Sequence, residues 1–194
     1  MAEISKKEQR RRQKLLREQV KPLSVAMRDQ AKNFYMIVGM GITRWPRMEE
    51  RLIQVAAKLL HIHEDKAGLV MYSIINVHVW LQIIDDLFVF DGTLPKSLKR
   101  WRSILSSIRA ENDIRVGLAH YSISQEDVDP GEELRAIQAF LRPGKLDIRK
   151  KSKTWKPLTM TEIGKFIGRV NDIHDALVSL LALMEAEIIA AKTA

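Results

Sequence analysis

The stretch TMTEIGKFIGRVNDIHDALVSLLALM, residues 159–184, decides the fold class. Its large apolar residues recur at spacings of three and four, which places them on one face of an α-helix. Thr159 and Glu162 have the spacing of a capping box, and Leu158 with Ile163 has that of a hydrophobic staple. The pattern predicts a long, capped C-terminal helix. Its apolar seam consists of Ile163, Phe166, Val170, Ile173, Leu177, Leu180 and Met184.

Helical periodicity also dominates the earlier part of the chain. A basic helix can begin at the Ser5-x-x-Glu8 capping spacing, and we expect it to end or kink at Pro22. Residues 23–42 form a second candidate helix, and Pro46 suits the first turn of a third. The apolar stripe of this third helix is Met48, Leu52, Val55, Ala56, Leu59 and Leu60.

Two further helices are predicted in the middle of the chain. Between residues 65 and 90, apolar side chains cover most of a helix surface, which predicts the central and most buried helix. Leu98, Trp101, Leu105 and Ile108 form the next stripe. Asn112 and Arg115 continue that stripe with polar groups, which we therefore expect beside the core.

These patterns together predict an all-α fold, an antiparallel bundle of four to five helices. Residues 1–22 form a basic N-terminal helical extension, and residues 23–194 form a single helical domain. Residues 122–158 lack a sustained period and make a basic, irregular insertion before the last helix. Turn signals stand at residues 129–131 and 142–145, and we expect a small hairpin around the second.

The composition excludes several classes of protein. The chain of 194 residues is 46% hydrophobic, which is enough for one core-bearing domain. It contains no cysteine, which excludes disulfides, thiolate zinc sites and cysteine nucleophiles. Its longest apolar stretches, residues 34–42 and 176–184, fall far short of the ~20 residues that span a bilayer. We therefore expect a cytoplasmic protein with no secretory signal and no membrane segment.

Positive charge is concentrated in two segments. The net charge is +8, yet residues 1–21 carry eight basic and three acidic side chains, and residues 142–157 carry seven and one, which leaves −3 for the rest. Such clusters bind phosphates without reading sequence, and an aromatic ring among them can stack on an unpaired base. A solvated helix and a loop anchored to the bundle by its tryptophan are the alternative interpretations. The candidate nucleic-acid-binding residues are Arg10, Arg11, Arg12, Lys14, Arg149, Lys150, Lys151, Lys153 and Trp155.

Other residues of chemical interest have simpler explanations. Residues 61–65 combine two histidines with two carboxylates, but a loop followed by an N-cap at Asp65 explains them better than a metal site. His78 stands in an apolar helix, which predicts a packed core residue. Residues 85–86 are acidic, and capping or pairing to an arginine is favoured over a magnesium site because no second acidic cluster matches them. His174 is expected on a helix surface, and we predict no metal and no cofactor.

The segment AENDIRVGLAHY, residues 110–121, carries the strongest candidate for catalysis. Histidine can take a proton from a ribose 2′-hydroxyl near neutrality, and a guanidinium can neutralise charge on the phosphate. On an ideal helix Arg115 and His120 point about 140° apart. A distortion at Gly117, or two protomers around a common cleft, would bring them together. The alternative is a surface ion pair between Glu111 and Arg115, with His120 ending the helix.

In this segment the sequence resembles the HEPN superfamily, small helical bundles that carry an arginine followed after four to six residues by a histidine. The likeness includes residues 45–49, the apolar run over residues 73–86 and the stripe from Trp101 to Ile108. With a capped last helix over residues 159–191, it covers about two thirds of the chain. Val116 departs from the family pattern, which often has Asn, Asp or His directly after the arginine.

The resemblance implies a homodimer whose facing motifs form a composite cleft, often an endoribonuclease in toxin, antiviral defence or RNA-processing systems. It implies that Arg115 stabilises the phosphate and that His120 is the acid/base. Asn112, one turn before Arg115, can supply a polar group to the same site. The implied partners are RNA and a cognate antitoxin or regulatory protein. Many members of the family are noncatalytic, so a dimerisation or partner-binding module is the alternative function.

Overall fold

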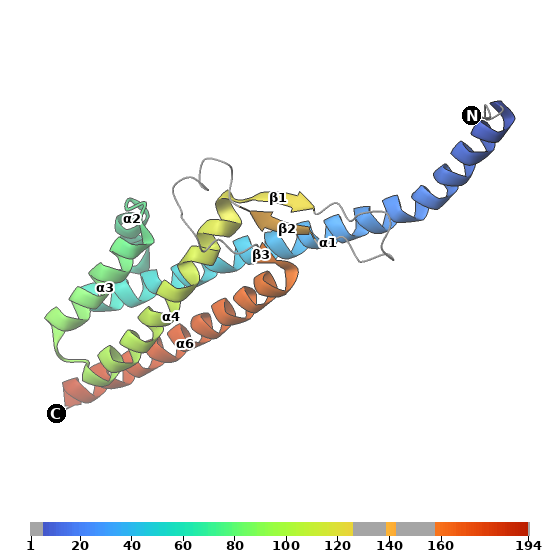
Figure 1. Cartoon of the computed structure of the whole chain (residues 1–194). Coiled ribbons are helices and arrows are strands. Elements are labelled where there is room, and N and C mark those ends of the chain that lie inside the picture. The colour runs from blue at the N-terminus through green and yellow to red at the C-terminus, as the bar shows by residue number, and fades with distance from the viewer. Residues whose placement is uncertain (1–5, 126–138, 143–157, 194) are drawn as a thin grey trace.

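The structure, a computed structural model, describes residues 6–125, 139–142 and 158–193, with side chains for residues 28–121, 140–141 and 158–193. Within these ranges it has five helices: α1 (Lys6–Leu60), α2 (Glu64–Tyr72), α3 (Val77–Asp91), α4 (Pro95–His120) and α6 (Met160–Thr193). The strands β1 (Ser122–Gln125), β2 (Ala139–Arg142) and β3 (Leu158–Thr159) form a small antiparallel sheet with β2 in the middle. The predicted all-α helical bundle is confirmed (Figure 1).

Helix α1 is one continuous helix of 55 residues, so the separate helices predicted on either side of Pro22 and Pro46 are wrong. Pro46 is on the exposed side of α1, whereas Gly41, Trp45 and Met48 around it are buried. Burying a large apolar side chain contributes about 1.5–3 kcal/mol, which offsets the ~3 kcal/mol that a proline costs inside a helix. The N-terminal part of α1 projects beyond the other helices (Figure 1).

Helices α1 and α6 run side by side in the same direction, with α4 antiparallel to α6. Trp45 stacks on Phe166, with ring centroids 6.2 Å apart, and further along both helices Lys58 pairs with Glu185. Helix α4 runs the opposite way, as its contacts with α6 show. The physical reason is the insertion over residues 122–158, which begins at the end of α4 and starts α6 at that same end of the bundle.

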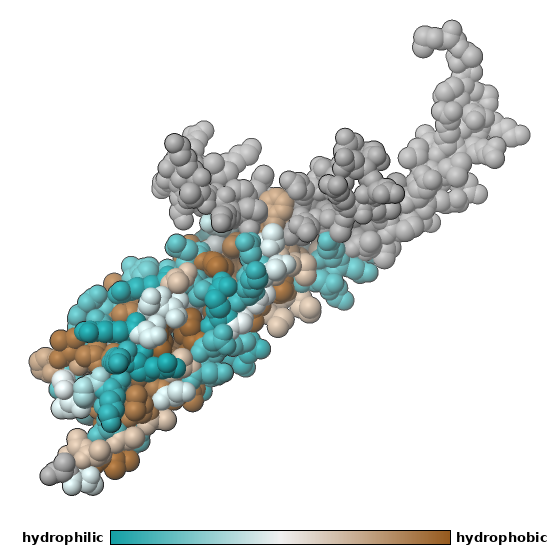
Figure 2. Space-filling view, turned by 60° about the horizontal axis from the view of Figure 1, so that its bottom comes forward, coloured by the Kyte–Doolittle hydropathy of each residue, from teal (hydrophilic) through white to brown (hydrophobic). Residues whose placement is uncertain are grey.

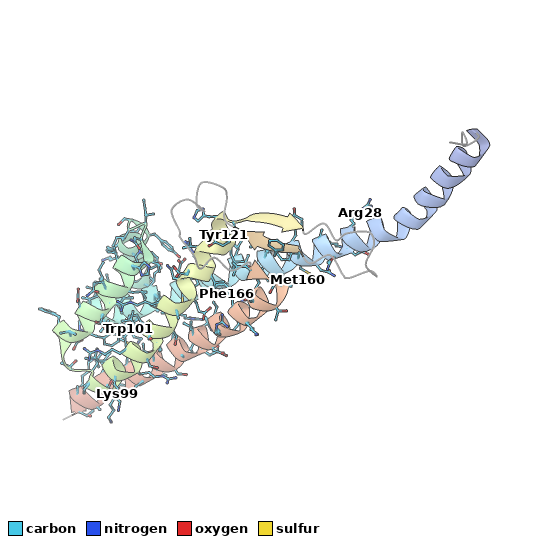
Figure 3. All side chains as sticks on the ribbon, in the orientation of Figure 1. Arg28, Lys99, Trp101, Tyr121, Met160 and Phe166 are labelled. Carbon is cyan, nitrogen blue, oxygen red and sulfur yellow. The ribbon has the colours of Figure 1, made fainter. Side chains whose placement is uncertain are left out.

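The predicted apolar stripes form the core of the bundle. Trp101 on α4 and Phe166 on α6 are fully buried (Figure 3). Among the described residues, every helix is too short or too polar to span a bilayer. The buried seam of α6 matches the predicted one residue for residue: Ile163, Phe166, Val170, Ile173, Leu177, Leu180 and Met184.

Side-chain hydrogen bonds cap the starts of α4 and α6. The capping box of α6 is confirmed, because Thr159 N donates to Glu162 Oε2 at 3.2 Å and Glu162 N donates to Thr159 Oγ1 at 3.3 Å. At the start of α4, Glu187 of α6 accepts from the backbone N–H groups of Lys96 and Ser97, at 3.0 and 2.9 Å. Burial opposes ionisation of Glu187, but the hydrogen bond from the Ser97 hydroxyl and those from the two backbone N–H groups hold its pKa below the ordinary value.

The predicted central helix over residues 65–90 is instead two helices, α2 and α3, and much of its apolar surface is exposed. Asn76 caps α3 by accepting from His78 N at 2.9 Å. Leu69, Ile75 and Phe90 are 77%, 102% and 91% exposed. The prediction was wrong because α1 and α4 cover only one side of this segment. Figure 2 shows apolar side chains reaching the surface at the end of the bundle away from the N-terminal part of α1.

Gly117 marks the close approach of α4 to the sheet. A Cβ atom at this position would lie 2.8 Å from Leu158 Cδ1 and 3.1 Å from Tyr121 Cε2. Leu158 is 9% exposed, so it has little room to move. Gly117 therefore serves packing. Tyr121 N donates to Gly117 O at 2.8 Å in regular helical register, so of the two ways to bring Arg115 and His120 together, a distortion at this residue is absent.

Two glycine-to-alanine changes should alter stability in opposite directions. Gly117→Ala should lower the free energy of unfolding by about 1–2 kcal/mol, because overpacking outweighs the gain in helix propensity. Gly168→Ala is the matched control: this helical position in α6 is exposed and has no atom within 4 Å of an added Cβ. It should raise the free energy of unfolding by about 0.5–1 kcal/mol. Urea unfolding followed by circular dichroism measures both, and equal effects would contradict the packing role of Gly117.

Candidate functional site

A hollow of about 630 Å³ lies where the C-terminal half of α4 meets α3 and the segment before it. Arg115 and Asn112 line it from α4, and His78 and Trp80 line it from α3. Asn112 and Arg115 continue the buried stripe of α4, as predicted, so they lie at the border of the core. A concave site of this size is typical of small-ligand and cofactor pockets.

Asn112 is the most buried polar group in the hollow. It is 6% exposed, its Nδ2 lies 3.1 Å from His78 Nε2, and its Oδ1 has no hydrogen-bond partner among the described residues. His78 is exposed, so the prediction of a packed core histidine is wrong. Its position 34 residues before Asn112 gives no local sign of this contact, because only the crossing of α3 and α4 brings them together.

Arg115 is half-buried and makes no ion pair or hydrogen bond with the residues that the structure describes. The expected helix-surface pair with Glu111 is absent, because Glu111 turns to α6. There its carboxylate accepts two hydrogen bonds from Arg169, at 2.5 and 2.9 Å. These bonds raise the pKa of Arg169 against the opposing effect of burial. Arg115 is thus left facing the hollow with its charge unneutralised by this carboxylate.

His120 is the last residue of α4 and is exposed. It does not line the hollow that contains Arg115 and Asn112. Because α4 is regular to its end, the ideal helical separation of about 140° between the two side chains applies. One chain therefore brings Arg115 together with Asn112 and His78, and it does not bring Arg115 together with His120.

Aromatic and acidic groups complete the walls of the hollow. Tyr72 and Trp80 meet edge to face with centroids 5.5 Å apart, and Trp80 donates its indole N–H to the Ile74 carbonyl at 2.8 Å. Burial, together with the carboxylates of Glu49 and Glu50, raises the pKa of Tyr72, so its phenol stays neutral. Glu49 also lines the hollow and accepts a hydrogen bond from the Trp45 indole at 2.8 Å.

The candidate nucleic-acid-binding side chains lie outside the part of the chain whose side chains are described. These are Arg10, Arg11, Arg12 and Lys14, for which only the helical backbone of α1 is described, and Arg149, Lys150, Lys151, Lys153 and Trp155 in the insertion. The backbone of the N-terminal part of α1 projects beyond the other helices (Figure 1).

The described residues contain no group of three or more potential metal ligands. In residues 61–65, His63 rather than Asp65 is the N-cap of α2, with Nδ1 accepting from Asp65 N at 3.3 Å. Asp85 accepts from the Trp101 indole at 3.0 Å instead of pairing with an arginine. His174 accepts from Arg51 Nε at 3.2 Å on the surface between α6 and α1.

Comparisons of the chain with protein-family models, with curated proteins and with solved structures found no match.

Proposed function

We propose that this protein is a HEPN-like RNA-binding protein that cleaves RNA without a metal ion, in a toxin, defence or RNA-processing role. The observation that supports the proposal is Arg115, a half-buried guanidinium that lines a hollow beside a buried amide and has no carboxylate partner among the described residues. A guanidinium held in this way favours an anionic ligand and can stabilise charge developing on a phosphate.

The proposed reaction uses the ribose 2′-hydroxyl of the RNA as nucleophile. One histidine takes the 2′-hydroxyl proton while the 2′-oxygen forms a bond to phosphorus. The bond from phosphorus to the 5′-oxygen breaks, and the same imidazolium gives its proton to that oxygen. The products are a 2′,3′-cyclic phosphate and a 5′-hydroxyl, so no water and no metal is consumed in this step. We assign both proton transfers to one His120 side chain in each cleft.

Two protomers supply the arrangement that one chain lacks. Since Arg115 and His120 diverge on a regular helix, Arg115 of one protomer meets His120 of its partner across a homodimer. Ile75 and Tyr72 support this arrangement, because they line the hollow and are 102% and 59% exposed. The basic segments at residues 1–21 and 142–157 would hold the RNA backbone through phosphate contacts that weaken with salt.

The test is RNA cleavage in EDTA by wild type and by Arg115→Gln. Loss of the guanidinium should lower the cleavage rate by about a hundredfold or more, because a fixed donor at a developing oxyanion contributes on that scale. Arg109→Gln is the matched control, since Arg109 is an exposed arginine of α4 that does not line the hollow. It should keep the wild-type rate. Cleavage unchanged in Arg115→Gln would contradict the proposed site.

A noncatalytic dimerisation or partner-binding module is the second candidate function. The apolar surface of α2 and α3 favours it, because single soluble chains seldom expose large apolar side chains side by side. The residues concerned include Leu69, Val70, Ile75 and Val79, each between 42% and 102% exposed. Wild-type protein that self-associates, or binds an antitoxin-like partner, and cleaves no RNA would establish this function instead.

A further inference from the structure

The hollow contains a hydrogen-bond acceptor that contact with a phosphate would not use. Only 6% of the surface of Asn112 is exposed, and its Oδ1 has no hydrogen-bond donor among the described residues. His78 Nε2 lies 3.1 Å from Asn112 Nδ2, so only the nitrogen of this amide has a partner among the described residues. Buried acceptors without a donor are rare in folded proteins. The unpaired oxygen therefore indicates a ligand that donates a hydrogen bond.

The charges around Asn112 narrow the chemistry of that ligand. Arg115 brings a positive charge to the hollow, and Glu49 brings a carboxylate with one oxygen held by the Trp45 indole. A ligand that fits must offer N–H donors to the acceptors and a negative group to Arg115. A simple anion meets only the second condition.

Tyr72 supplies a surface for a flat ring. Its side chain lines the hollow, is 59% exposed and contacts the edge of Trp80, which holds it in place. Aromatic side chains of this kind stack on unpaired nucleic-acid bases. A hollow of about 630 Å³ is large enough for a base together with its sugar and phosphate.

We propose that this hollow is a base-specific subsite for single-stranded RNA, in which Asn112 Oδ1 accepts a hydrogen bond from the exocyclic amino group of the base. Adenine, cytosine and guanine carry such a group, whereas uracil has no exocyclic amino group and presents carbonyl oxygens that would face Asn112 and Glu49. Asn112 is then the specificity-determining residue, and His78 is a positioning residue that holds its amide. This inference rests on the proposed RNA binding but not on cleavage.

The first experiment compares adenosine 5′-monophosphate with purine riboside 5′-monophosphate, which lacks only the amino group. Nitrogen-15 NMR of the side-chain amides follows binding directly. Wild type should bind the adenine nucleotide about tenfold more tightly, on the scale of a good base contact. Asn112→Leu should abolish this ratio, and Asn171→Leu, at an exposed asparagine of α6, should preserve it. Equal binding of the two nucleotides by wild type, or no binding of either, would overturn the proposal.

The second experiment uses 2′-fluoro pentanucleotides of adenine or uracil, which cannot be cleaved because they lack the 2′-hydroxyl. Wild type should prefer the adenine strand about tenfold. If the wild-type protein prefers the adenine strand but cleaves no RNA, the subsite is supported and the nuclease proposal is contradicted. Equal binding of both strands by an active nuclease would remove the subsite alone. A preference seen with mononucleotides but not with RNA would assign the hollow to free nucleotides and contradict an RNA subsite.

A second variant tests the subsite in case Asn112→Leu does not fold. If Asn112→Leu loses its helical circular dichroism signal, Tyr72→Ala at an exposed position replaces it. Removing the stacking surface should weaken both purine nucleotides by a similar factor, about tenfold. Unchanged binding of both nucleotides by folded Tyr72→Ala would exclude this hollow as the binding site.

Discussion

Mixing Arg115→Gln protein with His120→Ala protein should restore RNA cleavage to about a quarter of the wild-type rate, provided that the two side chains act across a twofold dimer. Each variant alone is expected to be inactive, because every composite cleft lacks one of the two groups. After random exchange of protomers, half of the dimers are mixed, and each mixed dimer contains one intact cleft and one that lacks both groups.

The control replaces one partner in the mixture. Combining His120→Ala with the double variant Arg115→Gln/His120→Ala leaves no intact histidine in any dimer, so cleavage should stay at the background of the single variants. Recovery is measured in EDTA after incubation long enough for protomers to exchange. No recovery in the first mixture, with exchange demonstrated by mixed-mass dimers, would contradict a cleft shared between protomers.

Trp101→Ala should lower the free energy of unfolding by about 3–5 kcal/mol. Trp101 is fully buried, and its ring stacks on Phe88 with centroids 5.8 Å apart. Its indole N–H also donates to Asp85 Oδ1 at 3.0 Å, so truncation leaves a half-buried carboxylate without this donor. Urea unfolding measures the loss.

Trp101→Phe separates the two contributions of Trp101. Phenylalanine keeps an aromatic ring against Phe88 but has no N–H for Asp85. Trp101→Phe should lower the free energy of unfolding by about 1–3 kcal/mol, clearly less than Trp101→Ala, because most of the apolar contact remains. A cost for Trp101→Ala below about 1 kcal/mol would show that the centre of the α3–α4 contact tolerates a cavity, contrary to its dense packing.

Periodicity predicted the helices that pack along their whole length. In α6 every residue of the predicted seam is buried, and Thr159 and Glu162 form the predicted capping box. In α4, Trp101, Leu105 and Ile108 of the predicted stripe are buried, and Leu98 is partly buried against the core. These elements were predictable because burial on one face and capping at the end are both local, so neighbouring residues record them at fixed spacings.

Prolines and continuous apolar runs were misleading. Pro22 predicts the end or a kink of a helix and Pro46 predicts a helix start, yet α1 continues through both positions as one helix. At Pro46 the contacts of the buried face with distant helices outweigh the local cost of the ring. The run over residues 65–90 predicted a buried helix, but this chain covers only one side of it. Apolar composition does not distinguish burial within a chain from a surface available to another.

Some features of the candidate site could likewise be predicted from the sequence, and others could not. The positions of Asn112 and Arg115 beside the core followed from the α4 stripe, and their spacing of three put them on one face. The contact of Asn112 with His78 and the engagement of Glu111 by Arg169 did not follow, because each joins residues far apart in sequence. The nuclease role of His120 stays a prediction.

The sequence by itself determined a helical class, the faces that its long helices bury, their caps and the concentration of positive charge in two segments, since each of these depends on near neighbours or on composition. The tertiary structure decided that α1 is continuous, that α1 and α6 are parallel, that the surface of α2 and α3 is open, and that Arg115, Asn112 and His78 share one hollow. The reason is that these features depend on which helices meet and at what depth. Contact free energy summed over whole helix faces outweighs the local preferences of single residues.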